Sequence, residues 1–240
     1  MGGYSQAEFA WVPEWKGMSR LFVGPQKRQD VADGRSQRVF VFPWGFTWIN
    51  GADEFSAMWS DVACIYHLVT RHFHEGTPTY TSYCYTVQLV SGRTAFIRGR
   101  LAASRAAESK VVVLRPTPGV TTAVTIEQLG RMLESGVTRD QFPRAIDSFN
   151  AGQPVSFGPL TVDRTGISVA GQLARWSEIQ SVRTQNGSVR IRKADKRLAW
   201  KTLPVSVIPN YFVFDALVHA ILPSGRLADP VEAASRIRES

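Results

Sequence analysis

The chain has 240 residues, a length that suits two domains of about 100 residues each better than one domain. Hydrophobic residues make up 44% of it and charged residues 20%, so the composition is that of a folded globular protein and excludes wholesale disorder. The formal net charge is +8, which favours anionic partners such as phospholipid surfaces, nucleic acid or acidic proteins.

The cysteine content and the N-terminal sequence bear on the compartment. Cys64 and Cys84 are too few for a disulfide scaffold and fit a reducing compartment. The first residues lack a basic start followed by an apolar run, so we expect no signal peptide. The most apolar window, 39–49, is too short to cross a bilayer. We therefore expect a cytoplasmic protein that can bind to a membrane surface but does not span the membrane.

In the first half of the chain, alternation of apolar and polar residues predicts strands at 21–23, 38–42, 46–49, 61–73, 80–90, 94–98 and 111–114. The strands 61–73 and 80–90 form a long hairpin. If His74 faces Thr79 across the turn, six apolar or aromatic side chains share the core side: Cys64, Tyr66, Leu68, Tyr85, Val87 and Leu89. The mixed opposite side then carries Ile65, His67, Val69, Arg71, Ser82 and Thr86.

Two helices are expected next. Thr125 to Gln128 has the pattern of a capping box that begins the first helix, and Gly136 ends it. A second helix begins near Thr138, has Pro143 in its first turns, and stops at Gly152. The domain boundary then falls within 137–153.

The second half has a clearer pattern, with strands predicted at 157–162, 167–169, 173–176, 179–185, 188–193 and 198–202. Asn186-Gly187 is a strong signal for a two-residue type I′ hairpin turn between 179–185 and 188–193. A last helix begins after Asn210, which we expect to cap it with its side chain, and ends at Pro223.

A weak internal repeat links the two halves. Gly-Phe-Thr-Trp at 45–48 is followed by Trp-Ser-Asp-Val at 59–62, and Gly-Ile-Ser-Val at 166–169 is followed by Trp-Ser-Glu-Ile at 176–179. A hairpin and an amphipathic helix come after each. Duplication of one unit explains this order, and it predicts that Trp59 and Trp176 occupy equivalent buried positions.

Strands and hairpins followed by one helix, occurring twice, resemble the pleckstrin-homology-like (PH-like) fold. The segments 155–162, 166–167, 176–179 and 209–210 resemble a family of uncharacterised bacterial proteins, and this likeness covers 138–222. The resemblance implies an α+β, mostly β protein of two tandem PH-like domains, each a strongly bent antiparallel sheet or partly open barrel closed by a C-terminal helix. The expected parts are a first domain at 18–136, a linker helix at 137–153, a second domain at 154–222 and a frayed tail at 223–240.

The basic hairpin of the second half is the main candidate site. With a two-residue turn, Arg183 faces Arg190 and shares one side with Arg192, whereas Val182, Val189 and Ile191 face the core. Opposed like charges are unfavourable by roughly 0.2–1 kcal/mol unless water or an anion screens them. The candidate anion-binding residues are Arg183, Arg190, Arg192, Lys193, Lys196 and Arg197, with Lys201 close by. The alternative is a solvated outer face with Glu178 or Asp195 as counter-ions.

A second, weaker anion candidate consists of Lys27, Arg28, Arg35 and Arg38, in the segment after the first expected strand. PH domains that bind phosphoinositides often carry basic residues in the corresponding loop. Asp30 and Asp33 interrupt this cluster and weaken its field.

Metal and catalytic chemistry are not expected. The possible metal ligands of the first hairpin are Cys64, His67, His72, His74 and Cys84. The assumed register points Cys64 away from both His67 and Cys84, which argues against a zinc site and against a disulfide. The sequence has no nucleophile elbow, P-loop or dinucleotide fingerprint. We expect no enzyme activity and no cofactor.

The sequence therefore predicts a non-enzymatic adaptor whose tandem PH-like domains bind a protein partner. The alternative is a peripheral binder of anionic phospholipid headgroups through the basic hairpin at 183–201. Nucleic acid is the less favoured partner, because the basic residues are not interleaved with exposed aromatic ones along the sequence. No helix resembles the recognition helix of a helix-turn-helix.

Overall fold

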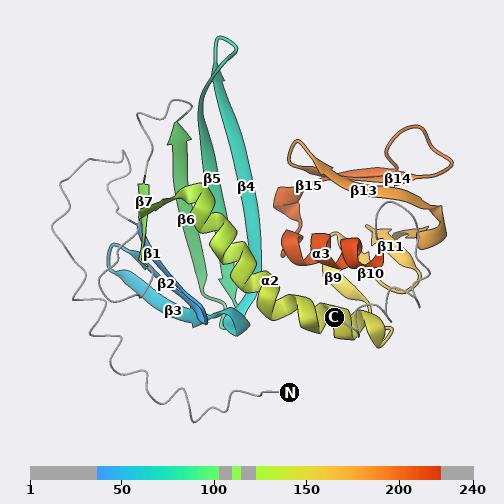
Figure 1. Cartoon of the computed structure of the whole chain (residues 1–240), viewed down its shortest axis with the longest axis horizontal. Coiled ribbons are helices and arrows are strands. Elements are labelled where there is room, and N and C mark those ends of the chain that lie inside the picture. The colour runs from blue at the N-terminus through green and yellow to red at the C-terminus, as the bar shows by residue number, and fades with distance from the viewer. Residues whose placement is uncertain (1–36, 103–109, 115–122, 223–240) are drawn as a thin grey trace. The chain divides into compact units, whose positions relative to one another are not determined.

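The computed structural model describes residues 37–102, 110–114 and 123–222 (Figure 1). The described chain is mostly β, with two α-helices, α2 (Ile126–Asn150) and α3 (Tyr211–Ile221). The strands of the first half are β1 (Gln37–Phe42), β2 (Gly45–Asn50), β3 (Asp53–Met58), β4 (Val62–His74), β5 (Thr77–Leu89), β6 (Thr94–Ala102), β7 (Lys110–Leu114) and β8 (Ala123–Thr125). Those of the second half are β9 (Val155–Phe157), β10 (Leu160–Val162), β11 (Gly166–Val169), β12 (Gln172–Arg175), β13 (Ile179–Gln185), β14 (Ser188–Lys193) and β15 (Lys201–Pro204).

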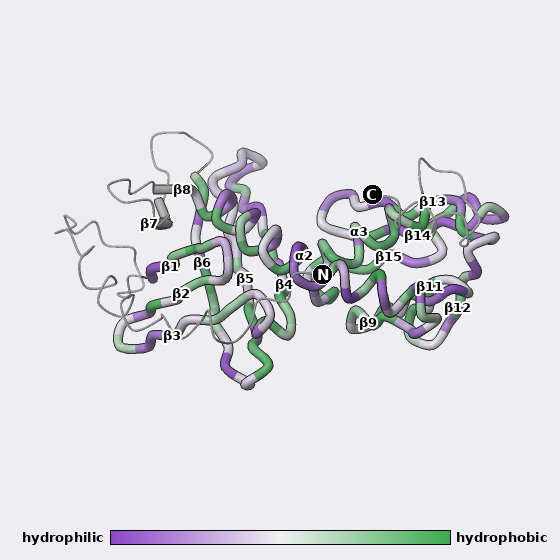
Figure 2. Tube along the Cα trace, turned by 60° about the horizontal axis from the view of Figure 1, so that its bottom comes forward, coloured by the Kyte–Doolittle hydropathy of each residue, from purple (hydrophilic) through white to green (hydrophobic). Residues whose placement is uncertain are grey.

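The strands form four sheets, ordered β3-β2-β1-β7-β8, β4-β5-β6, β12-β11-β10-β9 and β13-β14-β15. Neighbouring strands are antiparallel except β1 and β7, which run parallel. Within the described residues no sheet closes on itself. Hydrophobic and hydrophilic residues follow one another along the strands, as expected when one side of a sheet faces a core (Figure 2). Neither helix of the described chain has the length and apolarity needed to cross a bilayer.

The described chain has two hydrophobic cores, one in each half, and helix α2 contributes residues to both. Leu129, Leu133 and Val137 of this helix belong to the core of the first half, together with residues of β1–β6. Ala145 and Phe149 belong to the core of the second half, together with β9–β15 and α3. One long helix is therefore shared between the halves.

The prediction of two helices separated at Gly136 is wrong, because α2 is continuous from Ile126 to Asn150. A Cβ atom at Gly136 would overlap the indole of Trp59. The glycine is needed for this close approach, and it does not end the helix. Pro143 consequently lies inside the helix and not in a first turn.

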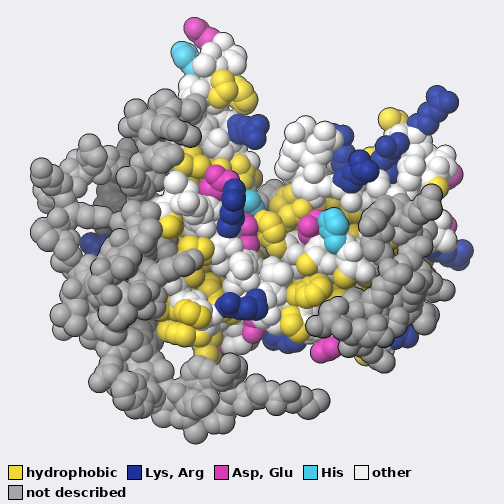
Figure 3. Space-filling model, in the orientation of Figure 1, with side chains coloured by type: hydrophobic (Ala, Val, Ile, Leu, Met, Phe, Trp, Pro, Cys, Tyr) yellow, Lys and Arg dark blue, Asp and Glu magenta, His cyan; other side chains and the backbone are white. Residues whose placement is uncertain are grey.

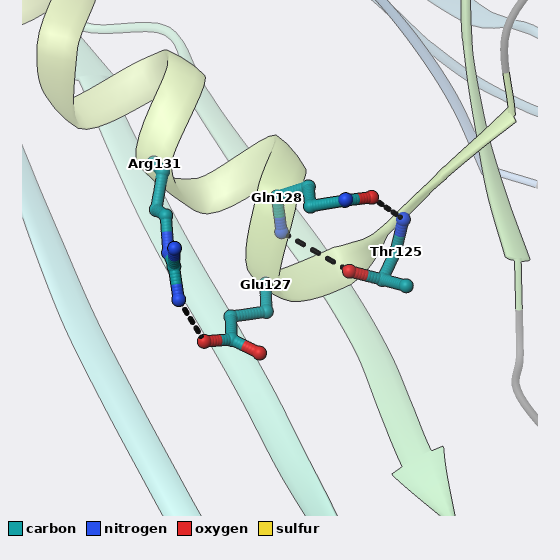
Figure 4. Close-up of polar contacts among 4 residues, drawn as sticks. All are labelled: Thr125, Glu127, Gln128 and Arg131. Carbon is teal, nitrogen blue, oxygen red and sulfur yellow. Dashed lines mark hydrogen bonds and ion pairs between the residues drawn. The ribbon is translucent and has the colours of Figure 1, made fainter. Parts of the chain in front are cut away.

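The start of α2 is the predicted capping box (Figure 4). Thr125 Oγ1 accepts a hydrogen bond from the Gln128 backbone N–H at 3.2 Å, and Gln128 Oε1 accepts one from the Thr125 N–H at 2.9 Å. Glu127 pairs with Arg131 one turn later. Two of the amides at the start of the helix, those of Thr125 and Gln128, thus find partners within four residues of sequence.

The internal repeat corresponds to a repeated structural motif. A short 3₁₀ turn starts at Trp59 in the first half and at Trp176 in the second, and these indoles are 4% and 3% exposed. The indole N–H of Trp59 donates to the Pro43 carbonyl at 3.0 Å, and that of Trp176 donates to the Asp163 carbonyl at 2.8 Å. The prediction of two equivalent buried tryptophans is confirmed.

The hairpin β13–β14 has the predicted register. Arg183 pairs with Arg190, Val182 with Ile191 and Ser181 with Arg192 around the turn at Asn186-Gly187. Both turn residues have positive φ, as a type I′ turn requires.

The hairpin β4–β5 does not have the predicted register. Its turn is the two residues Glu75-Gly76, both with positive φ, so His74 pairs with Thr77 and not with Thr79. A bulge after Pro78 then leaves the pairing one residue away from the predicted one. Cys64 accordingly pairs with Gln88 in place of Leu89, and Leu68 pairs with Cys84 in place of Tyr85.

A shift of one residue moves a strand's side chains to the other side of the sheet. Tyr85, Val87 and Leu89 of β5 are buried as predicted, but on β4 the core residues are Val62 and Ile65, with His67 half-buried beyond them. Cys64, Tyr66 and Leu68, which we had placed inside, lie on the outer side. Cys64 and Cys84 therefore share a side, contrary to the prediction, and both are free thiols four register positions apart.

Several element boundaries also differ. The strand expected at 157–162 is two strands joined at Gly158-Pro159, where Gly158 has a φ of +63°. Strand β3 was missed, and the strand expected at 198–202 is β15, Lys201–Pro204. The strand expected at 21–23 lies outside the described residues.

Asn210 precedes α3 but does not cap it with its side chain. Its φ is +52°, and its side chain turns to the edge of β4. There its Oδ1 accepts from the Ile65 N–H at 2.9 Å and its Nδ2 donates to the Ala63 carbonyl at 3.1 Å. Its own backbone N–H donates to the Ile65 carbonyl at 2.9 Å. The residue therefore satisfies backbone groups around the β-bulge at Ala63 instead of the free amides of α3.

Candidate anion-binding face

The basic residues of the second half lie on the sheet β13-β14-β15. The turn at Asn186-Gly187 sets the register, and side chains alternate between the two sides of the sheet. Val189, Ile191 and Leu203 are buried in the second core, so the alternate positions form the opposite, outer side. This basic face comprises Ser181, Arg183, Gln185, Ser188, Arg190, Arg192, Thr202 and Pro204.

Three exposed arginines lie close together on the basic face. Arg183 is directly opposite Arg190, which in turn pairs with Thr202 on β15. Arg192 is two residues along β14 on the same side. None of the three strands contains an aspartate or a glutamate, so no acidic side chain of the sheet itself neutralises the arginines. Figure 3 shows Lys and Arg side chains gathered in the region of β13 and β14.

The arginines are held by neutral groups only. Arg190 Nη1 donates to Gln185 Oε1 at 3.2 Å, and Arg192 Nη2 donates to the Arg197 carbonyl at 3.0 Å. Arg183 has no hydrogen-bond or ion-pair partner among the described residues. These contacts orient two guanidinium groups and leave all three charges available to an external anion.

Lys193 lies apart from the arginines. Its Nζ donates to Glu178 Oε2 at 2.7 Å and lies 4.8 Å from the ring centroid of Trp200. The hydrogen bond from Lys193 lowers the pKa of the Glu178 carboxyl. Of the two counter-ions considered, Glu178 thus pairs with Lys193, whereas Asp195 makes no ion pair within the described chain. The geometry separates Lys193 from the other candidate residues.

The loop from β14 to β15 adds further cations and an apolar side chain. Lys196 and Arg197 are exposed in this loop, and Lys201 starts β15 with its Nζ 5.6 Å from the ring centroid of Trp200. Between them Leu198 is 82% exposed, the most exposed of the large hydrophobic residues in the described chain. We had placed Leu198 in a strand, so its position at the tip of a basic loop was not predicted.

Of the second predicted cluster, only Arg38 lies within the described residues. Lys27, Arg28 and Arg35 lie outside the described residues. Arg38 lies in β1, opposite Ile49 of β2.

A buried polar pair in the first half was also not predicted. Glu134 of α2 is 6% exposed, and its Oε1 lies 3.2 Å from His67 Nδ1 of β4. Burial raises the pKa of the Glu134 carboxyl to about 8 and lowers the pKa of the His67 imidazole. Burial therefore favours the neutral form of both groups. Sequence periodicity gives no signal for this contact, because the two residues are far apart along the chain.

The possible metal ligands of the first hairpin do not converge. His72 stacks on Tyr80 with centroids 4.1 Å apart and shares a hydrogen bond with Ser82, while His67 contacts Glu134. Among the described residues no three His, Cys, Asp or Glu side chains are arranged to hold a metal ion.

Comparison with known proteins gives one match. Residues 121–226 match a family of unknown function (DUF6585), so this part of the chain is similar to an uncharacterised protein family. No curated protein and no solved structure matches the chain.

Proposed function

We propose that this chain is a non-enzymatic binding protein that attaches peripherally to anionic phospholipid headgroups through the basic face and the β14–β15 loop. The observation that carries the proposal is the cluster of Arg183, Arg190 and Arg192 on one side of a sheet whose three strands contain no acidic residue. Directly opposed arginines disfavour each other by roughly 0.2–1 kcal/mol, and a bound phosphate relieves that repulsion.

The exposed leucine favours a membrane over an acidic protein as the source of the anions. Leu198 lies between Arg197 and Lys201 in a loop next to the arginines. Cations near an anionic bilayer contribute about 1 kcal/mol each, and an apolar side chain beside them gains further by entering the interface. Four or five cations and one leucine are thus enough for useful reversible attachment.

The proposed architecture is two PH-like domains arranged in tandem. It is supported by the two matching tryptophan turns, each preceded by a hairpin starting at a glycine and followed by a three-stranded sheet and a helix. Each domain would present one three-stranded sheet whose outer side is free for binding.

Sedimentation with vesicles tests the lipid proposal. The full chain should sediment with phosphatidylcholine vesicles containing phosphatidylserine but not with phosphatidylcholine alone, and salt should weaken the attachment. Removing two cations, as in Arg190→Gln/Arg192→Gln, should lower the affinity about 30-fold, at about 1 kcal/mol for each. Leu198→Ser should lower it further.

The matched control is Arg98→Gln/Arg100→Gln, which removes two exposed arginines with the same spacing from β6 of the first half. This variant should sediment like the unmodified protein. If the unmodified chain does not bind anionic vesicles at low salt, or if both double variants lose attachment equally, the basic face is not a membrane site.

A protein-binding adaptor is the second candidate. Strand β4 lies at the edge of its sheet, and it exposes Val69 and Phe73 toward the end of the long hairpin. Exposed apolar residues on an edge strand favour a protein partner. In that case Phe73→Ser should abolish partner binding while vesicle attachment stays unchanged.

A further inference from the structure

The outer side of the sheet β4-β5-β6 combines aromatic and basic side chains. The register places Tyr66, Thr86 and Phe96 in one row across the three strands, and Thr70, Ser82 and Arg100 in another. Arg98 lies in the row between these two. His72 and Tyr80 form the last row before the turn of the hairpin. We call this outer side the aromatic face.

The aromatic face points away from the first core. Ile65, Tyr85, Val87 and Ile97 occupy the alternate positions of the same strands and are buried on the inner side, which α2 crosses (Figure 1). Phe96, by contrast, is 45% exposed, and Arg98 and Arg100 are also exposed.

Rings and guanidinium groups are already adjacent on this face. Arg98 lies 5.5 Å from the ring centroid of Phe96, and Arg100 lies 5.0 Å from that of Tyr80. His72 stacks on the same Tyr80 ring. The three strands contain no aspartate or glutamate on either side, so the face is positively charged.

We infer that the aromatic face binds single-stranded nucleic acid. The rings of Tyr66 and Phe96 offer surfaces on which unpaired bases stack, and Arg98 and Arg100 lie farther along β6 where the phosphates of such a strand would pass. The hydroxyl groups of Thr70 and Thr86 on the same face can hydrogen-bond to base edges or to ribose, whereas that of Ser82 is already bonded to His72. Tyr66 and His72 are six residues apart on β4, which is about 20 Å and suits a run of a few nucleotides.

The same observations argue against other anions for this face. A lipid headgroup or a phosphorylated side chain presents phosphate without a planar ring and would leave the aromatic side chains unused. A duplex exposes base edges in its grooves but keeps the base faces stacked inside, so it has no free face to stack on the rings. Sequence reasoning had set nucleic acid aside because cations and aromatics did not alternate. On the outer side of the sheet they nevertheless lie together, because Arg98 is next to Phe96 and Arg100 is next to Tyr80 of the neighbouring strand.

Fluorescence anisotropy tests the inference. The full chain is titrated at low salt into fluorescein-labelled 12-residue oligo(dT) and, separately, oligo(U). Loss of one stacking ring in Phe96→Leu or in Tyr66→Leu should weaken binding by about 5- to 150-fold, the equivalent of 1–3 kcal/mol for each base. Arg98→Gln/Arg100→Gln should reduce the slope of log K against log salt by about 1.4, since each phosphate contact to a single strand contributes about 0.7.

The control for charge is Arg190→Gln/Arg192→Gln, which removes two arginines from the basic face of the other sheet. It should leave oligonucleotide affinity unchanged and affect vesicle binding only, so this inference and the lipid proposal can fail separately. Inorganic polyphosphate of similar length, which has no bases, should compete poorly. Stronger binding of oligo(U) than of oligo(dU), which differs from it only in the 2′-hydroxyl groups, would show that the face prefers RNA.

Three results would overturn the inference. The first is no binding of either oligonucleotide at low salt. The second is binding that survives both Phe96→Leu and Tyr66→Leu in variants with the circular dichroism spectrum of the unmodified chain. The third is polyphosphate competing as well as unlabelled oligonucleotide, which would show attraction to charge alone.

Discussion

The two halves surround the same tryptophan turn with different cores. Trp59 and Trp176 have matching hydrogen bonds, and each is preceded by a hairpin whose first glycine touches the opposite strand. In the first half, however, the buried Glu134 carboxyl lies beside the half-buried His67, whereas the residues of the second core are all hydrophobic. The hairpin and the tryptophan turn are thus repeated in the two halves, whereas the helices that pack on the two cores, α2 and α3, differ in their side chains.

The two helices differ because α2 has glycines where it packs closely on the residues beneath it. A Cβ at Gly130 would overlap the Tyr85 hydroxyl, and one at Gly136 would overlap the indole of Trp59. Helix α3 covers the second core with large side chains instead, among them Phe214 and Leu217. Close approach in the first half brings the Glu134 carboxyl over the sheet beside His67, and the second half has no counterpart of this contact within its described residues.

The largest expected loss of stability comes from replacing the glycine that begins the hairpin in each half, a feature that the two halves share. In Gly45→Ala a Cβ would overlap the carbonyl oxygen of Ala57, and in Gly166→Ala it would overlap that of Ala174. Because both obstacles are backbone atoms of the paired strand, neither can move without opening the hairpin. Each variant should lose about 3 kcal/mol or more of unfolding free energy, measured by urea denaturation. A large loss in one variant with none in the other would show that the two turns are not equivalent.

A smaller effect should appear in the first half only. Gly136→Ala places a methyl group against Trp59, and we expect it to cost about 1–3 kcal/mol despite the better helix propensity of alanine. Tryptophan emission should change together with stability. Ser135→Ala, an exposed position one residue earlier on α2, is the control and should be neutral or slightly stabilising. If Gly136→Ala were as stable as this control, the close contact would not constrain the fold.

The smallest effect concerns pH. Burial raises the pKa of Glu134 to about 8 from 4.5, so the folded chain retains a proton that the unfolded chain has lost. Stability from this group is therefore complete below pH 4.5 and declines as pH rises to about 8. The pKa of His67 is lowered from 6.5, so protonation of this histidine destabilises the folded chain as the pH falls below 6.5. Above pH 6.5 it has little effect on the pH dependence that Glu134 causes.

The clean window is thus pH 6.5 to 8. There the advantage of the unmodified chain over Glu134→Gln should decline by up to about 1.4 kcal/mol per pH unit, measured by urea denaturation at constant ionic strength. An advantage that stays level across this window would mean that Glu134 is ionised in the folded chain. A second-half acid such as Glu178, whose pKa is lowered, should give no such decline when replaced by glutamine.

The two hairpins show how far sequence reasoning reaches. Asn186-Gly187 predicted the register of β13–β14 as far as Ser181, because that turn type has two residues and the strands run without a bulge up to this point. The turn at Glu75-Gly76 is of the same kind, but Thr77-Pro78-Thr79 resembles a longer loop. The bulge it forms, with Thr79 Oγ1 donating to the His72 carbonyl, cannot be read from alternation alone. Because the predicted register of β4 against β5 is one residue away from the observed one, it exchanges the inner and outer sides of β4.

The same limit applies to the sites. The opposed arginines of the basic face were predicted because they lie next to one turn. Glu134 and His67 meet only through the packing of α2 on its sheet, and the aromatic face depends on the register that was missed. Local chemistry is readable from sequence, whereas contacts between distant elements require the tertiary structure.

Helix α2 limits how far the number of residues between the two repeats can vary. Its Leu129 and Leu133 are fixed in one core and its Ala145 and Phe149 in the other, so the angle between these two stripes depends on the number of residues that separates them. Adding or deleting a single residue would rotate one stripe by about 100°, whereas a change of seven residues (about two turns) or eleven residues (about three turns) would bring it back to within about 20°. Loops between the strands can therefore vary in length more freely than the middle of α2, where an insertion or deletion must come close to a whole number of helical turns to keep both stripes in place.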